Sequence, residues 1–223
     1  MRSRPVVTID GPSGAGKTTV AKRLAESAGM VRVDTGAMYR AVALASRSVG
    51  VPWDDPVRLG GLARELDLSF RTVDGAPHVF LSGEDVSDAI RTPEMSMGAS
   101  AVSVHRPVRE ALVAKQREMA REGGVVLDGR DTGTVVFPDA EVKFFLDAAA
   151  AVRARRRYLE ISPPCGQPYE EVLRDVLRRD VQDSTRENSP LRVAEGAVYI
   201  DTTTMTVDEV VGEMLRRLPG VPR

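Results

Sequence analysis

Eight consecutive residues near the N-terminus, Gly11 to Thr18, have the spacing of a phosphate-binding loop, G-P-S-G-A-G-K-T. Its glycines let the chain curve tightly, so that backbone N–H groups close around phosphate oxygens. Lys17 would reach the β- and γ-phosphates of a nucleoside triphosphate, and the hydroxyl of Thr18 would ligate Mg²⁺. The pattern therefore predicts that the chain binds a nucleoside triphosphate together with Mg²⁺.

The residues on either side of this loop favour that interpretation over a glycine-rich turn that merely connects two elements. Apolar residues 6–9 predict a buried strand before it. Val20, Leu24 and Ala28 recur at helical spacing after it, and Gly29 is a typical helix end. Strand, glycine-rich turn and helix form the context that the motif requires, and a helix N-terminus favours a bound anion.

A second candidate site follows the apolar run 125–128. Asp128 ends this predicted strand, where its carboxylate could hold Mg²⁺ directly or through water; the alternative is an aspartate that caps a turn. Arg130 could bind an acceptor phosphate through two hydrogen bonds. Asp131 could accept a hydrogen bond from an exocyclic amino group such as cytosine N4. An ion pair between Arg130 and Asp131 would explain both residues equally well.

Polar side chains also follow the predicted strand 31–34. Asp34, Thr35, Tyr39 and Arg40 stand at its carboxyl end, the edge at which parallel sheets bind ligands. Arg40 could bind an acceptor phosphate; the alternative is a charge on a solvated helix.

Two predicted helices near the C-terminus carry arginines at helical spacing. The charged residues are Arg153, Arg156 and Arg157 on the first helix and Arg179, Asp183 and Arg186 on the second. On continuous helices each set would share a face. We predict that the two faces form a lid, about residues 153–168, which closes over the triphosphate. Ion pairs on a solvated helix surface would produce the same spacing.

The order of predicted elements is typical of an α/β protein with a five-stranded parallel sheet flanked by helices. The predicted strands are residues 6–9, 31–34, 125–128, 142–146 and 198–201, and predicted helices include 37–49, 148–159 and 169–183. Residues 66–83 differ, because they alternate around Asp74-Gly75 and predict an antiparallel hairpin, which cannot easily join a parallel sheet. We therefore predict a core of residues 1–62 and 106–223 with an inserted lobe over residues 63–105.

Composition narrows the class of protein. The chain of 223 residues is 42% hydrophobic and 28% charged, which is ordinary for a soluble globular protein. Its net charge of −1 creates no global field that would attract nucleic acid or an anionic membrane. No apolar run approaches membrane-spanning length. The single cysteine, Cys165, permits no disulfide within the chain and favours the reducing cytoplasm.

Several segments together resemble bacterial cytidylate (CMP) kinase, a nucleoside monophosphate kinase of the P-loop class. The matching segments are Ile9–Lys17, Asp34–Arg40, Asp128–Pro138 and Arg179–Arg186, and they span almost the whole chain. Many kinases share the P-loop, whereas the run G-R-D-T-G-T-V-V-F-P is specific to this family. The inserted lobe is a family feature too, and it enlarges the monophosphate-binding region.

The resemblance implies a P-loop kinase fold and transfer of the γ-phosphate of ATP to CMP or dCMP with Mg²⁺. It implies ATP contacts from Gly11, Pro12, Ser13, Gly14, Ala15, Gly16, Lys17, Thr18, Thr19 and Arg157, and Mg²⁺ ligands Thr18 and Asp128. It implies CMP contacts from Ser13, Thr35, Tyr39, Arg40, Ser100, Arg109, Arg130, Asp131, Arg179, Asp183 and Arg186. Among these, Ser100, Arg109 and Asp131 match cytosine-reading residues, and Arg130 and Arg186 match residues on the acceptor phosphate. Catalytic roles are expected for Lys17, Asp128, Arg130 and Arg186.

The sequence departs from the family pattern in two places. Thr18 stands where Gly or Ser is common, and Pro163-Pro164-Cys165 is unusual in a lid. We expect CMP and dCMP as partners, no nucleic-acid or membrane partner, and a monomeric protein.

Other classes fit less well. A kinase for another small acceptor is the nearest alternative, and Asp131 distinguishes the two because a carboxylate attracts the amino group of cytosine and repels the 4-oxo group of uracil. A GTPase would use an Asn-Lys-x-Asp segment, but the sole asparagine, Asn188, is followed by Ser-Pro. A nucleic-acid-binding module is weaker still, because aromatic residues make up only 4% of the chain and do not interleave with the basic clusters.

Overall fold

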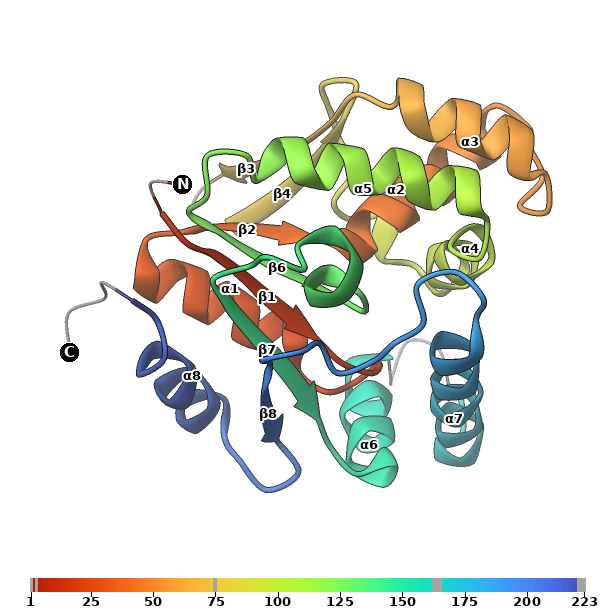
Figure 1. Cartoon of the computed structure of the whole chain (residues 1–223). Helices are drawn as coiled ribbons and strands as arrows, with labels where there is room; N and C mark the ends of the chain where they lie inside the picture. The colour runs from red at the N-terminus through yellow and green to blue at the C-terminus, as the bar shows by residue number, and fades with distance from the viewer. Residues whose placement is uncertain (1, 3, 74–75, 162–165, 220–223) are drawn as a thin grey trace. The chain divides into compact units, whose positions relative to one another are not determined.

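The computed structural model describes residue 2 and residues 4–73, 76–161 and 166–219 (Figure 1). Two compact units make up the chain. The first joins Met1–Val31 to Glu122–Arg223, and the second is Arg32–Arg121. The predicted division at residues 63 and 105 stays a prediction, although the whole of that segment falls within the second unit.

The first unit alternates strands with helices. Its strands are β1 (Val6–Asp10), β6 (Val125–Gly129), β7 (Val142–Asp147) and β8 (Val198–Asp201). Its helices are α1 (Lys17–Ala28), α6 (Ala150–Ile161), α7 (Tyr169–Thr185) and α8 (Val207–Leu215), with a π-helical turn η2 over Thr132–Val136. β2 (Val31–Asp34) carries the chain from the first unit into the second. The predicted strands and helices agree with these bounds to within two residues at each end.

The five strands form one parallel sheet in the order β2-β6-β1-β7-β8, which confirms the predicted fold class. β1 lies in the middle: Val6 pairs with Val125 of β6, and Val7 pairs with Val142 of β7 (Figure 1). This register brings Asp10 beside Gly129 at the carboxyl end of the sheet. The phosphate-binding loop and the segment after β6 therefore leave the sheet at the same edge.

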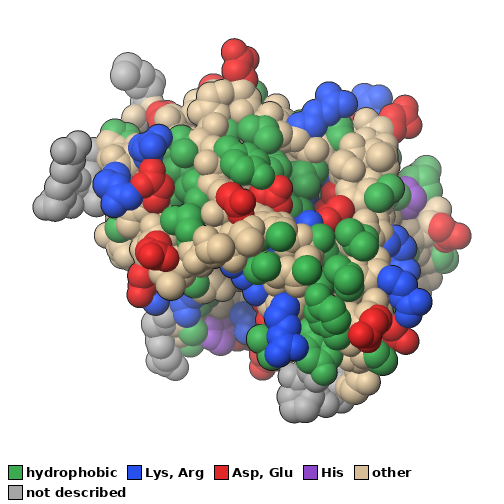
Figure 2. Space-filling model, turned by 90° about the horizontal axis from the view of Figure 1, so that it is seen from below, with side chains coloured by type: hydrophobic (Ala, Val, Ile, Leu, Met, Phe, Trp, Pro, Cys, Tyr) green, Lys and Arg blue, Asp and Glu red, His purple; other side chains and the backbone are tan. Residues whose placement is uncertain are grey.

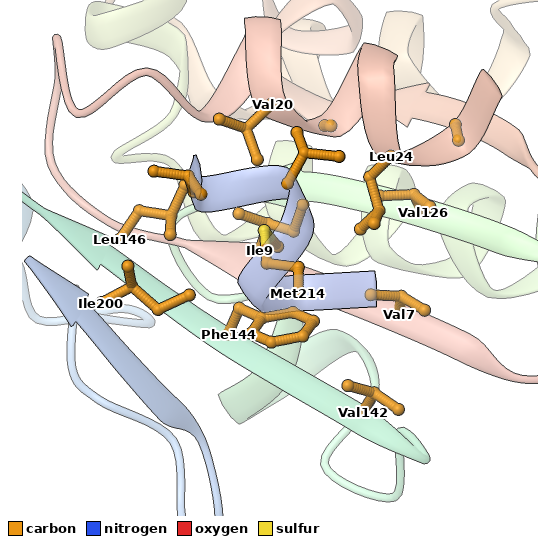
Figure 3. Close-up of a cluster of buried hydrophobic side chains, with 14 of the residues drawn as sticks. Val7, Ile9, Val20, Leu24, Val126, Val142, Phe144, Leu146, Ile200 and Met214 are labelled. Atoms are coloured by element: carbon orange, nitrogen blue, oxygen red, sulfur yellow. The ribbon is translucent and has the colours of Figure 1, made fainter. Parts of the chain in front are cut away.

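Apolar side chains from the sheet and from α1 and α8 form the core of the first unit (Figure 3). Ile9, Leu24, Phe144 and Met214 are each less than 2% exposed. Burying one such side chain stabilises a fold by roughly 1.5–3 kcal/mol. α1 presents Val20 and Leu24 to this core. The helix ends at Gly29, a left-handed C-cap whose backbone N–H donates to the last turn. The helix that starts at Lys17 is therefore held firmly against β1.

The second unit is mainly helical. It contains α2 (Thr35–Ser48), α3 (Pro56–Glu65), α4 (Pro93–Val102) and α5 (Arg106–Met119), with a short 3₁₀ turn η1 over Ala89–Arg91. α2 packs against α4, and α3 against α5. A Cβ on Gly98 of α4 would lie 2.6 Å from the Trp53 ring and 2.7 Å from Cβ of Ala43, so a larger residue would push these helices apart.

The predicted hairpin is confirmed. β3 (Leu68–Val73) pairs antiparallel with β4 (Ala76–Leu81), which also pairs with β5 (Glu84–Asp85). These strands make a separate three-stranded sheet, as the antiparallel pattern required. The predicted turn at Asp74-Gly75 lies outside the described residues.

Acidic and basic side chains are interspersed on the face drawn in Figure 2, in keeping with the net charge of −1. Within the described ranges, every helix is too short or too polar to cross a lipid bilayer.

Candidate active site

The loop between β1 and α1 curves through glycines with positive φ. The φ angles of Gly11, Gly14 and Gly16 are +150°, +78° and +86°. A Cβ on Gly11 would lie 1.9 Å from the carbonyl oxygen of Leu146, and one on Gly14 would lie 2.8 Å from that of Arg153. Only glycine therefore lets the loop pack this closely against the ends of β7 and α6. α1 begins after Gly16 without a side-chain cap, and the N–H groups of such a first turn are suited to an anion.

Lys17 lies inside this loop. Its side chain is mostly buried, and Nζ donates a hydrogen bond to the Pro12 carbonyl oxygen at 2.6 Å. Burial and the positive charge of Arg130 lower the pKa of Lys17 well below its ordinary value, against the opposing charges of Asp128 and Asp183. A bound triphosphate would favour the charged ammonium, so the group is placed to respond to that ligand.

Thr18 and Asp128, the two residues predicted to ligate Mg²⁺, lie next to each other. Oγ1 of Thr18 donates to Oδ2 of Asp128 at 3.3 Å, and the Asp128 carboxylate is 4% exposed at the end of β6. A hydroxyl, a carboxylate, phosphate oxygens and water are the hard oxygen ligands that Mg²⁺ prefers. No cluster of three or more His, Cys, Asp or Glu side chains that could hold a metal occurs in the described part of the chain.

A charged network lies beside the loop, between the end of β6 and the end of α7. Nε of Arg130 donates to Oδ2 of Asp183 at 2.7 Å. Arg186 lies 3.9 Å from Asp183 and 3.8 Å from Asp131 between the nearest charged atoms. Burial acts to raise the pKa of Asp183, but the charges of Arg130, Arg186 and Lys17 hold it below its ordinary value. The structure therefore brings Arg130 and Asp183 together, although the sequence places them 53 positions apart.

Arg186 lies just beyond the end of α7, so it does not share a helix face with Arg179 and Asp183. α7 ends at Thr185, and Arg186 is its C-cap with extended backbone angles of φ −59° and ψ 140°. Nε of Arg186 donates instead to the Ser189 carbonyl oxygen at 2.7 Å. Arg186 thus reaches Asp183 by a turn of the chain rather than by helical periodicity.

Other cations gather near Arg130. Burial, followed by repulsion from Arg157 and Arg130, lowers the pKa of Arg179 below its ordinary value. Lys17 experiences the same repulsion from Arg130. Like charges brought together in a partly buried place are stabilised by an anion, so this cluster is a candidate phosphate site.

Arg153, on the first helix of the predicted lid, is held by contacts to α7 and to the phosphate-binding loop. Arg153 is 6% exposed and binds Asp180 of α7 through two hydrogen bonds of 2.9 and 2.7 Å. Its Nη1 also donates to the Ser13 carbonyl oxygen at 3.2 Å. Arg156 donates to Thr202, at 3.0 Å to the hydroxyl and 2.6 Å to the carbonyl oxygen. Residues 162–165 of the predicted lid, Cys165 included, lie outside the described residues.

The predicted residues of the second unit cluster at the start of α2. Asp34 caps this helix by accepting from Ala37 N–H at 2.9 Å and pairs with Arg40 and Arg32 at 3.2 and 3.1 Å. Although burial acts to raise the pKa of Asp34, these charges and hydrogen bonds hold it below its ordinary value. Nε of Arg40 is buried and has no hydrogen-bond partner among the residues that the structure describes. Such a donor is suited to an acceptor from a ligand.

A second group lies around Tyr39 of α2. The guanidinium of Arg109 on α5 is 5.5 Å from the centre of the Tyr39 ring, and both residues are buried. Arg109 also donates to the Ser103 carbonyl oxygen at 3.2 Å, while the Ser103 hydroxyl donates to the carbonyl oxygen of Ser100 at 2.9 Å. Tyr39 and Arg109 are therefore neighbours, and Thr35 is buried at the first position of α2.

Comparison with known proteins identifies the family. A family model described as cytidylate kinase matches residues 7–219. The chain belongs to the cytidylate kinase family. It is 52% identical to a cytidylate kinase of Geobacter sulfurreducens over 211 residues, which are 94% of this chain and 90% of the relative. It is 43% identical to a cytidylate kinase of Pasteurella multocida over 216 residues, 96% of this chain and 95% of the relative.

A solved structure supports the fold alone. An uncharacterized protein from Eubacterium ventriosum matches with a TM-score of 0.51 and 11% identity, covering 97% of this chain and 99% of that one. The protein is an enzyme of the kinase class, and its family phosphorylates CMP and dCMP with ATP.

The sequence patterns assigned no role to Asp10 of this cytidylate kinase family member. Its buried carboxylate accepts hydrogen bonds from Thr132 and Gly133, in the segment after β6. The signal available in the sequence was an acidic residue that ends an otherwise apolar strand directly before the loop. That signal alone does not say which segment supplies the donors.

Asp10 should make the stability of the protein depend on pH. Burial is the largest influence on the pKa of Asp10 and raises it, as does the charge of Asp131. The hydrogen bonds from Thr132 and Gly133 lower it but are outweighed, so the pKa is about 6. Lys17 is the cation that faces this carboxylate. Because the pKa of Asp10 is higher in the folded protein than in the unfolded chain, its protonated form adds to the free energy of unfolding, and this contribution is complete below about pH 4. The contribution, at most about 3 kcal/mol, is lost as the pH rises through about 6. Asp10→Asn cannot titrate, so urea denaturation should show the wild type losing stability relative to this variant between about pH 4.5 and 6.5. A difference that stays constant over this range would contradict the pKa assignment.

Proposed function

We propose that this protein transfers the γ-phosphate of ATP to CMP or dCMP, forming ADP and CDP or dCDP. The observation that carries the proposal is the convergence of Lys17, Arg130 and Arg179 beside the Thr18–Asp128 pair, in a chain that matches the cytidylate kinase family over residues 7–219. Phosphoryl transfer needs positive charge at the moving group and exact positioning of the acceptor, and it needs little covalent chemistry.

The donor nucleotide is assigned to the loop after β1. Backbone N–H groups of Gly11 to Thr19 would cradle its phosphates, with Lys17 on the β- and γ-phosphates and Arg157 as a further contact. Thr18 and Asp128 would hold Mg²⁺, which neutralises phosphate charge when it is bound. Their hydrogen bond of 3.3 Å and the burial of Asp128 fit an oxygen-ligand site.

The acceptor nucleotide is assigned to the side chains that match the family's acceptor site. The proposed contacts are Ser13, Thr35, Tyr39, Arg40, Ser100, Arg109, Arg130, Asp131, Arg179, Asp183 and Arg186. Arg130 and Arg186 would bind the acceptor phosphate. Both arginines pair with Asp183, and this pairing keeps their guanidinium groups oriented for that contact. Asp131 would accept a hydrogen bond from the cytosine amino group, and Asp183 would bind the sugar.

The chemistry requires no dedicated general base, because an acceptor phosphate oxygen is already a nucleophile. Lys17 would neutralise the charge that develops on the transferred group, and Arg130 and Arg186 would hold the acceptor in line with it. We further propose that the protein works as a monomer in the cytoplasm, that residues 63–105 extend the acceptor region, and that residues 153–168 include a lid.

Release of ADP from ATP, measured with a panel of acceptors, tests the proposal. Expected acceptors are CMP and dCMP, while UMP, purine monophosphates and small sugars should give little turnover. Turnover with a sugar, and none with any cytidine nucleotide, would favour the alternative of a kinase for another small acceptor.

Asp131→Ala tests the assignment of the base-reading residue. The variant should lose about tenfold or more of the preference for CMP over UMP, because it no longer attracts the amino group or repels the 4-oxo group. The KM for ATP should stay within about twofold of the wild-type value, since the donor loop is a different segment. An unchanged CMP-to-UMP ratio of kcat/KM would refute this role of Asp131.

A further inference from the structure

A buried carboxylate joins the strand before the phosphate-binding loop to the segment after β6. Asp10 is the last residue of β1 and is 2% exposed. Its Oδ1 accepts from the backbone N–H and the hydroxyl of Thr132, at 2.9 and 2.8 Å. Its Oδ2 accepts from the backbone N–H of Gly133 at 2.7 Å. A carboxylate with donors on both oxygens is fixed in one orientation, and it fixes its donors in return.

The segment that Asp10 holds has little room to move. Thr132 is fully buried, and a Cβ on Gly133 would lie 2.8 Å from Oγ1 of Thr8. The carbonyl oxygen of Asp131 accepts backbone N–H bonds of 2.9 and 3.2 Å that close the π-helical turn η2. The backbone of Asp131 is therefore held between the end of β6 and a turn whose first two N–H groups are bonded to Asp10.

We propose that Asp10 is a positioning residue for the acceptor nucleotide: by holding Thr132 and Gly133 it orients Arg130 and Asp131, and so sets the preference for cytosine over uracil. This inference rests on the proposed function, in which Asp131 reads the base. Asp10 also directly precedes Gly11, so one side chain connects the loop assigned to ATP with the segment assigned to CMP. A misplacement of about 1 Å in such a segment can lower a rate about 100-fold.

The chemistry of the three hydrogen bonds calls for a carboxylate. An asparagine offers one acceptor oxygen and an NH₂ group, so Asp10→Asn would set a donor against a backbone N–H of Thr132 or Gly133. The segment would have to shift to relieve that contact. Thr132→Val is milder, because it removes the hydroxyl donor and retains both backbone N–H bonds. The two variants therefore perturb the same contact to different degrees.

The test compares kcat/KM for CMP and for UMP in the full-length wild type and in these variants, at saturating ATP. Asp10→Asn should lower kcat/KM for CMP about 10- to 100-fold and that for UMP less, so the CMP-to-UMP ratio should fall about fivefold or more. Thr132→Val should change the ratio in the same direction by a smaller factor. A general loss of active protein lowers both values equally and leaves the ratio unchanged.

Val7→Ala is the matched structural control. Val7 is in the same strand and fully buried, but it faces the apolar core, so this variant should lower the melting temperature without changing the ratio. Amide hydrogen exchange over residues 130–136 should be faster in the Asp10 and Thr132 variants and not in Val7→Ala, a readout that does not depend on activity.

Two outcomes would overturn the inference: a wild-type ratio in every folded variant of Asp10 and Thr132, or an equal change of the ratio in Val7→Ala. If Asp10→Asn does not fold, Thr132→Val alone decides by the same criterion. A wild type that releases no ADP with CMP would instead overturn the proposed function, and hydrogen exchange would still show whether Asp10 holds the segment.

Discussion

Replacing Lys17 by methionine is expected to lower kcat about 1,000-fold or more, because the variant loses the cation placed for the transferred phosphoryl group. Nζ of Lys17 lies within the loop, 2.6 Å from the Pro12 carbonyl oxygen, and the side chain is buried. In a site of low dielectric constant, a positioned charge stabilises a transition state far more than the same charge in water.

The same substitution should not destabilise the protein. Burial and Arg130 lower the pKa of Lys17, which means that the folded protein without nucleotide disfavours this ammonium. Methionine has a similar length and no charge to desolvate. The melting temperature of Lys17→Met should therefore equal or exceed that of the wild type, so that lost activity cannot be attributed to unfolding.

Steady-state ADP release at saturating ATP and CMP measures the effect, and thermal unfolding accompanies it. Lys22→Met is the matched control on the same helix, because Lys22 is 44% exposed and its pair with Glu26 is long, at 3.9 Å. Its kcat should remain within about twofold of the wild-type value. A Lys17→Met variant that retained more than about a tenth of wild-type kcat would exclude the proposed role of this charge.

Local patterns predicted most of the first unit. A short apolar run is enough to predict a buried strand, and the glycines with Lys17 are enough to predict the loop after β1. Both predictions succeed because these features depend on neighbouring residues in the chain. The hairpin of β3 and β4 could be predicted equally well, since alternation with a period of two is specific to strands. The Thr18–Asp128 contact also followed from the sequence, because parallel strands bring their carboxyl ends to one edge of the sheet.

Contacts that depend on tertiary packing could be predicted less well from the sequence. Helical spacing shows which residues share a face, but it does not show what that face meets, so the pair of Arg153 with Asp180 could not be predicted from it. Spacing also assumes that the helix continues, and α7 ends one residue before Arg186. Asp10 was missed because its donors lie 122 and 123 residues away in the chain.

The pair of Arg153 and Asp180 leads to the second large expected effect. Arg153 is nearly fully buried, Asp180 is one-quarter exposed, and two hydrogen bonds of 2.9 and 2.7 Å join them. Asp180→Ala would remove the close carboxylate from the buried guanidinium and leave it the longer pair of 3.8 Å with Asp147, which should lower the free energy of unfolding by about 3 kcal/mol. Because Asp180 stands between Arg179 and Asp183 on α7, a displaced helix should also lower activity toward CMP.

Asp175→Ala is the matched control for this prediction. Asp175 pairs with Arg178 on the same helix at 2.7 Å, but Arg178 is 74% exposed, so its loss should change stability by less than about 1 kcal/mol. Urea denaturation of both variants gives the comparison. The double variant Arg153→Met/Asp180→Leu removes both charges and should recover stability relative to Asp180→Leu alone, because no unpaired guanidinium remains buried. Equal, small losses in Asp180→Ala and Asp175→Ala would mean that water replaces the carboxylate beside Arg153, and that the pair does not hold α7 against the phosphate-binding loop.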